Sequence, residues 1–99
     1  MMTDEVDIPA ELFGADLRDG YDVISAEPRP GERVFVTPGA SVDVRRPVWV
    51  YVESTQPAAM PGFVFVVGRQ LRGNKAHERC RLYCRISALR VERANHDAR

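Results

Sequence analysis

Apolar and polar residues alternate along most of the chain after residue 20, which is the pattern of half-buried β-strands. The clearest case is PVWVYVES at residues 47–54, where three valines would face one side of a strand and Trp49 and Tyr51 the other. The next stretch, GFVFVVGRQL at residues 62–71, is apolar on both faces for five residues, as a central strand of a sheet would be. Shorter runs of this kind predict further strands at residues 21–27, 33–37, 42–46 and 78–93.

The beginning of the chain has a different pattern. IPAELFGADL, residues 8–17, predicts a short helix, because Pro9 suits the first helical position and Leu12 and Leu17 would hold the helix against a core. Residues 1–8 and 94–99 have no such pattern, and we expect them to be loose termini. The length of 99 residues fits one domain, residues 1–99.

Six short runs separated by turns rich in Pro and Gly predict a mainly-β fold. We expect a small antiparallel β-barrel or sandwich of about five or six strands, with the short N-terminal helix beside it. SH3-like and OB-like barrels and Ig-like sandwiches all have about this number of strands, and the pattern does not choose among them. The Cys…Trp…Cys spacing of a true Ig domain is absent.

In the last run, ERCRLYCRISALRVER at residues 78–93, apolar and polar positions alternate and predict a strand from about Arg79 to Val91. Its apolar positions would share one face: Cys80, Leu82, Cys84, Ile86 and Ala88. Its polar positions would share the other: Arg79, Arg81, Tyr83, Arg85 and Ser87. The alternation changes phase after Ala88, which predicts a β-bulge or a bend near Ser87 to Leu89.

The two cysteines of this run raise the question of a metal site, because His77, Cys80 and Cys84 have the spacing H-x2-C-x3-C. On a strand, however, two residues four apart lie about 13 Å apart, at ~3.3 Å per residue. Such cysteines cannot bind one zinc ion or form a disulfide with each other. We therefore expect two small buried thiols, with no metal and no cofactor.

Charge changes the picture, because a net charge of zero hides an uneven distribution. Residues 1–32 hold nine acidic and two basic side chains, and residues 33–99 hold twelve basic and five acidic ones. This asymmetry indicates either a basic binding surface or an acidic segment that folds over a basic one.

The polar face of the last run is the candidate binding site. Arg79, Arg81 and Arg85 flank Tyr83, and basic side chains beside an aromatic ring are how β-barrels bind single-stranded nucleic acid. Further basic residues upstream, and two aromatic residues of the strand at 47–54, would extend the site: Arg69, Arg72, Lys75, Trp49 and Tyr51. Against this interpretation, the net charge is zero, and the same arginines could pair with acidic residues of neighbouring strands.

Known catalytic patterns are missing from the sequence. There is no G-x-S-x-G, no glycine-rich phosphate loop, and only two histidines, so we expect no enzyme. We expect a non-catalytic regulatory or accessory domain that binds a protein partner, with nucleic-acid binding by a small β-barrel as the alternative. An unpaired sheet edge would also permit a homo-oligomer.

The sequence also predicts the setting of the protein. No apolar run approaches the ~18 residues that a membrane helix needs. The N-terminus MMTDEVD is acidic, whereas a secretory signal is basic and then apolar. We therefore expect a cytoplasmic protein with no membrane partner.

Overall fold

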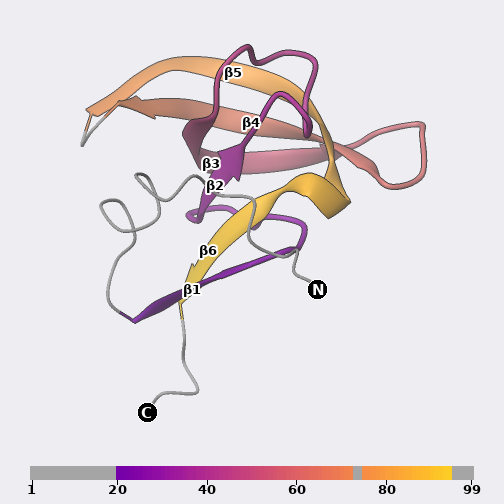
Figure 1. The fold of residues 1–99 in the computed structure, drawn as a ribbon. Coiled ribbons are helices and arrows are strands. Elements are labelled where there is room, and N and C mark those ends of the chain that lie inside the picture. Colours follow the sequence, from indigo (N-terminus) through magenta and orange to yellow (C-terminus); the bar gives the residue numbers. More distant parts are fainter. Residues whose placement is uncertain (1–19, 73–74, 95–99) are drawn as a thin grey trace.

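The computed structural model of the chain describes residues 20–72 and 75–94. Within these ranges the chain forms six antiparallel strands and one 3-10 helix: β1 (Tyr21–Ile24), β2 (Arg33–Val36), β3 (Val48–Pro57), β4 (Phe63–Arg72), β5 (Lys75–Arg85), η1 (Ile86–Ala88) and β6 (Arg90–Ala94). The strands pair in the order β1-β6-β2-β3-β4-β5 (Figure 1). The mainly-β antiparallel prediction is therefore confirmed. The expected helix at residues 8–17 lies outside the described residues, as do residues 1–8 and 95–99 of the expected loose termini.

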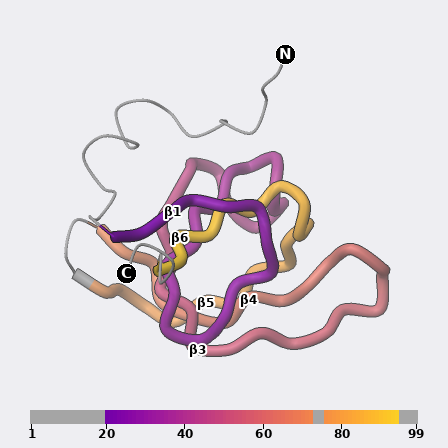
Figure 2. Tube along the Cα trace, turned by 90° about the horizontal axis from the view of Figure 1, so that it is seen from below, coloured from indigo at the N-terminus to yellow at the C-terminus, as the bar shows by residue number. Residues whose placement is uncertain are grey.

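The sheet is not closed into a barrel, so the prediction of a barrel is wrong. β1 and β5 are its two edges and do not pair with each other, and the described strands form one sheet rather than the two of a sandwich. Residues 40–43 take the place that a closing strand would need, because they bond to the C-terminal part of the β5 edge. Seen from below, β3, β4 and β5 lie on one side and β1 with β6 on the other, so the open sheet still curls (Figure 2).

Two irregular positions explain how one sheet can enclose a core. The β3–β4 register shifts between Val52 and Ser54, and the β4–β5 register shifts between Arg69 and Leu71. Bulges of this kind bend a strand and increase its twist. The inner face of the curled sheet carries most of the main core, together with loop residues: Val34, Val36, Ala40, Val44, Val50, Val52, Val64, Val66, Leu82, Cys84, Leu89 and Val91. We use "outer face" for the opposite side of the sheet.

The phase change near Ser87 to Leu89 is real, and of the two expected causes the structure shows a bend and not a bulge. The expected single strand from Arg79 to Val91 is two strands, separated by the 3-10 helix Ile86–Ala88. This turn takes the chain from the β5 edge to β6, which lies between β1 and β2. The chain thus changes its position in the sheet at the point where the alternation slips.

The expected strand at residues 42–46 does not form. The Ser41 hydroxyl accepts a hydrogen bond from the amide of Asp43 at 3.1 Å, and this local bond competes with strand pairing. The two valines of this run do not share a buried face either, because Val42 is 88% exposed and Val44 is buried.

Other boundaries also moved. β1 ends at Ile24 instead of residue 27, and β3 continues past residue 54 to Pro57. Lys75 to His77 also belong to β5, which begins three residues before the expected strand at residues 78–93 and pairs Lys75 with Arg72.

Candidate binding surface

Strand β5 presents its two faces as the alternation predicted. Cys84 is 0% exposed and Leu82 is buried beside it, whereas Arg79, Arg81 and Arg85 are exposed on the outer face. Burial raises the pKa of the Cys84 thiol to about 12, and it also raises the pKa of the half-buried Cys80. Both thiols are therefore protonated at neutral pH and poor nucleophiles.

An aromatic stack with an arginine at each end covers the outer face of β4 and β5. Arg81 lies over Phe65, with its Cζ atom 3.8 Å from the ring centroid, and Arg85 lies 5.8 Å from the centroid of Phe63. Between them Tyr83 stacks on Phe63, at 5.0 Å and 10°, and tilts against Phe65, at 5.1 Å and 49°. We call these five residues the arginine-capped stack. The stack follows from the register, because Phe63 lies opposite Arg85 and Phe65 opposite Tyr83.

Polar contacts hold the neighbouring arginines in place. Arg81 donates from Nε to Oε1 of Gln56 at 3.0 Å. Arg79 and Arg69, which lie opposite each other in the register, share the carboxylate of Glu53, at 2.9 Å and 3.3 Å. The hydrogen bond from Arg79 is the main cause that lowers the pKa of Glu53, although partial desolvation opposes it. One carboxylate thus serves two guanidinium groups.

The surface keeps an excess of positive charge. Arg81 and Arg85 have no carboxylate partner among residues 20–72 and 75–94. Glu32, from the acidic first third of the chain, pairs instead with Arg93 at 2.6 Å, on the β6 side of the sheet. Glu32 therefore does not reach the arginines of β5, and Asp22 and Glu27 form no ion pair with them.

The free edge of β5 is only half occupied. The amide of Arg85 donates to the carbonyl of Ala40, and the amide of Tyr83 donates to Oδ2 of Asp43, each at 2.8 Å. Alternate residues of an antiparallel strand turn their N–H and C=O groups to the same side. The amides of Arg79 and Arg81 therefore point to the same edge, and they have no partner in the part of the chain that the structure describes.

The structure separates Trp49 and Arg72 from this surface. Trp49 is 6% exposed and packs against Phe35, with ring centroids 5.1 Å apart, so it does not serve as an open stacking residue. The partly exposed guanidinium of Arg33 lies 4.5 Å from the Trp49 ring centroid. Tyr51, by contrast, is 42% exposed and lies opposite Arg69 on the outer face.

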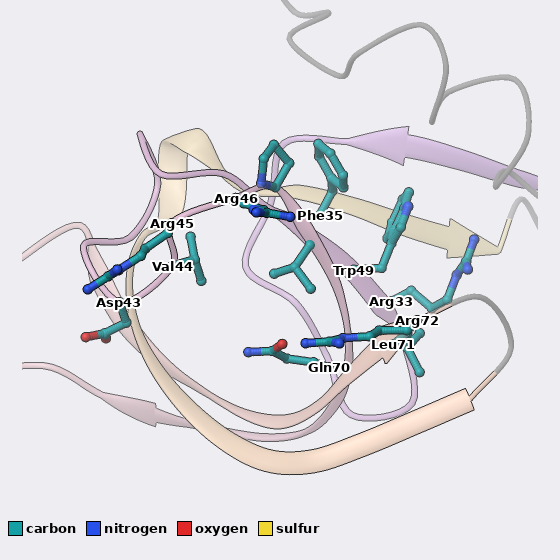
Figure 3. Close-up of a pocket in the computed structure, with 12 residues that line it drawn as sticks. Arg33, Phe35, Asp43, Val44, Arg45, Arg46, Trp49, Gln70, Leu71 and Arg72 are labelled. Carbon is teal, nitrogen blue, oxygen red and sulfur yellow. The ribbon is translucent and has the colours of Figure 1, made fainter.

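Arg72 lines a cavity of about 500 Å³ at the end of β4 (Figure 3). Arg45 and Arg46 from the loop before β3 also line it, as does Trp49. Lys75 lies opposite Arg72 in the register of the β4–β5 hairpin. The expected site residues are thus divided between the outer face of β5 and the neighbourhood of this cavity.

Sequence reasoning missed two of the five residues of the arginine-capped stack. Phe63 and Phe65 were expected inside a central strand, because residues 63–67 are apolar on both faces. In the structure only Val64 and Val66 are buried, and the two phenylalanines are half-buried on the outer face beside Tyr83. The signal was the alternation itself: aromatic rings fall at every second position, in phase with the outer face of the neighbouring strand.

The described residues show no gathering of three or more His, Cys, Asp or Glu side chains that could hold a metal ion. In the same part of the chain, no helix has the length and apolar character needed to cross a membrane. Compared with known protein families, with curated proteins and with solved structures, the chain matches none.

Proposed function

We propose that this domain is a non-catalytic binding module that engages a protein partner through the outer face of β5. The observation that carries the proposal is the arginine-capped stack, in which Arg81 and Arg85 are held against aromatic rings without a carboxylate partner among the described residues. The chemistry that fits these side chains is a partner surface rich in Asp and Glu. Such a module would act as a regulatory or accessory domain rather than as a catalyst.

Preorganisation is the physical reason why this surface suits binding. A cation over an aromatic ring is stabilised by about 0.5–1 kcal/mol at an exposed site, and the bond to Gln56 also fixes the guanidinium of Arg81. An arginine already held in one rotamer loses less entropy when a partner binds. Its remaining N–H groups keep the planar fork that matches a carboxylate.

Nucleic acid is the second candidate, because the same guanidinium groups also fit phosphate and because no acidic residue at 20–32 covers them. The stack argues against it. Sequence-tolerant binding of single strands needs aromatic faces on which bases can stack. Here Phe63 and Tyr83 stack on each other and Arg81 covers a face of Phe65, so each ring already has one face occupied.

A titration tests both candidates. Labelled glutamate-rich peptides and single-stranded and duplex DNA and RNA would be titrated with the protein at about 50 and 200 mM salt. An Arg81→Gln/Arg85→Gln variant removes the two capping charges, and an Arg45→Gln/Arg46→Gln variant removes the same charge elsewhere. We expect the acidic peptide to bind, to lose affinity in the first variant and to keep it in the second.

Two results would overturn this proposal. Tighter binding of DNA or RNA than of the acidic peptide, lost in the Arg81→Gln/Arg85→Gln variant, would establish the nucleic-acid function instead. Equal loss of peptide binding in both variants would mean that the peptide follows overall charge and not this surface.

A further inference from the structure

We infer that the partner is an extended acidic segment that adds to the sheet as a further antiparallel strand along the free edge of β5, an inference that rests on the proposed function. The partner would carry acidic residues at every second position. Both the backbone and the side chains of β5 lead to this geometry.

The backbone of β5 offers a short, defined place for such a strand. The edge-facing amides of Arg79 and Arg81 have no partner among the described residues, whereas those of Tyr83 and Arg85 are bonded to residues 40–43. An added strand would therefore extend over the part of β5 before Tyr83 and end where the loop begins. Extended peptides bind other sheets in this manner, with main-chain hydrogen bonds giving affinity and alternate side chains giving specificity.

The side chains of β5 set the sequence that the strand should have. Arg79 and Arg81 point to the outer face, about 6.6 Å apart at ~3.3 Å per residue. Residues two apart on an antiparallel partner have the same spacing, and cross-strand neighbours have Cβ atoms about 4.5–5.5 Å apart. Acidic residues at alternate positions would thus stand opposite the arginines. The positions between them would face the half-buried Cys80, where an uncharged side chain fits.

A second copy of this chain fits the same edge poorly. Antiparallel pairing of β5 with β5 of another copy would place Arg79 and Arg81 near the same arginines of that copy. Like charges directly opposite each other destabilise a strand pair, and charged edges are one way in which natural sheets avoid self-association. The arginine row therefore selects against self-pairing and in favour of an acidic strand.

The hydrogen-bond pattern of antiparallel strands makes the inference testable with one peptide and two methylated forms of it. In an antiparallel pair, the residue that stands opposite Arg79 also turns its own N–H toward β5. For a seven-residue peptide that alternates Glu and Thr, the Glu amides would face β5 and the Thr amides would face solvent. Methylation of the Glu amides should weaken binding by about tenfold to a hundredfold, because two or three hydrogen bonds are lost. Methylation of the Thr amides should leave the affinity close to that of the parent peptide.

Hydrogen exchange of the 99-residue chain gives the second readout. Binding of the Glu/Thr peptide should slow exchange of the Arg79 and Arg81 amides, and leave the Tyr83 and Arg85 amides nearly unchanged. A peptide that alternates Lys and Thr should not slow exchange of the Arg79 or Arg81 amide.

The possible failures can be told apart. Equal binding of both methylated peptides, without protection of Arg79 and Arg81, would overturn strand addition and leave the proposed function standing. If a flexible glutamate-rich peptide binds and the Glu/Thr peptide does not, strand addition is again overturned and the proposed function again stands. If no acidic peptide binds at about 50 mM salt, both the inference and the proposed function are overturned.

Discussion

Among single residues, Gly68 occupies the place where β4 has no room for a side chain. It lies opposite Val52 on β3 and Cys80 on β5, next to the bulge of β3. A Cβ atom at this position would overlap the carbonyl oxygen of Tyr51 and lie 3.2 Å from Cγ1 of Val50. The close approach of β3 and β4 at this point therefore requires glycine.

We predict that Gly68→Ala lowers the free energy of unfolding by about 1–3 kcal/mol, the usual cost of overpacking. Urea unfolding would measure the change. The matched control is Gly39→Ala, where the new Cβ would meet only Oγ1 of Thr37 at 3.7 Å, and where we expect a change within about 0.5 kcal/mol. Equal unfolding midpoints for the two variants would show that β3 and β4 can separate at no cost, against this prediction.

The ion pair between Arg33 and Glu92 is the second residue-scale feature with a clear consequence. Glu92 is 0% exposed, and Arg33 donates to both of its carboxylate oxygens, at 2.8 Å and 2.9 Å. We predict that Arg33→Met destabilises the protein by about 3–5 kcal/mol, because it leaves a buried charge without its main counterion. The double variant Arg33→Met/Glu92→Leu should recover most of that loss in thermal unfolding. A double variant as unstable as Arg33→Met would show that the loss comes from packing around Arg33 and not from the buried Glu92 carboxylate that has lost Arg33.

At the scale of elements, the described residues cover one half of the β5 edge and leave the other half open. We predict that the amides of Arg79 and Arg81 exchange rapidly with solvent, while those of Cys80, Leu82 and Tyr83 are protected. Asp43→Ala should speed exchange at Tyr83 by removing its acceptor, and Asp43→Asn should restore much of the protection, because an amide oxygen also accepts. Amide exchange followed by NMR measures both. Unchanged exchange at Tyr83 in Asp43→Ala would mean that the loop covers the strand without bonding to it.

The elements also show which features of the fold the sequence could predict. Strict alternation placed Cys84 and Leu82 inside and Arg81 outside correctly, because one side of a pleated strand must be buried for the sheet to be stable. The same logic failed for residues 42–46, where a local hydroxyl–amide bond outweighs the alternation of only two valines. The long-range facts lay beyond any local pattern. Neither the open sheet nor the burial of Trp49 follows from spacing along the chain, since both depend on which strands become neighbours.

For the candidate surface, too, the sequence predicted the residues of one strand but not their contacts with the neighbouring strand. Arg79, Arg81, Tyr83 and Arg85 could be found from one strand alone. The contribution of Phe63 and Phe65 depends on the β4–β5 register, which places Phe63 opposite Arg85 and Phe65 opposite Tyr83. The identification of one strand was thus possible from sequence, and the identification of the stack was not.

At the scale of the whole molecule, acidic side chains hold arginines at two places on the sheet besides the buried Arg33–Glu92 pair. Glu53 joins β3 to Arg69 on β4 and Arg79 on β5, and Glu32 joins the start of β2 to Arg93 on β6. Burial alone would raise the pKa of Glu32, but hydrogen bonds from Arg93 and from the amide of Arg29 outweigh it and lower the pKa overall. The pKa of Glu53 is also lowered. The folded protein therefore holds both carboxylates in the charged form more strongly than the unfolded chain does.

The free energy of unfolding should consequently fall as the solution becomes more acidic. A carboxylate whose pKa is lowered by folding stabilises the protein fully above its unfolded pKa, about 4.3 for Glu, and this stabilisation is lost as the pH falls through the folded value. We predict a thermal midpoint that falls as the pH is lowered from about 5 to 3. Glu32→Gln should be less stable than the parent at pH 7 and should fall less steeply, so that the two curves converge in acid. Arg93→Gln should give the same shallower curve, and the double variant should add little to either, because all three remove one interaction. If Glu32→Gln instead runs parallel to the parent from pH 7 to 3, the pair with Arg93 does not contribute to acid sensitivity, and the dependence belongs to other carboxylates.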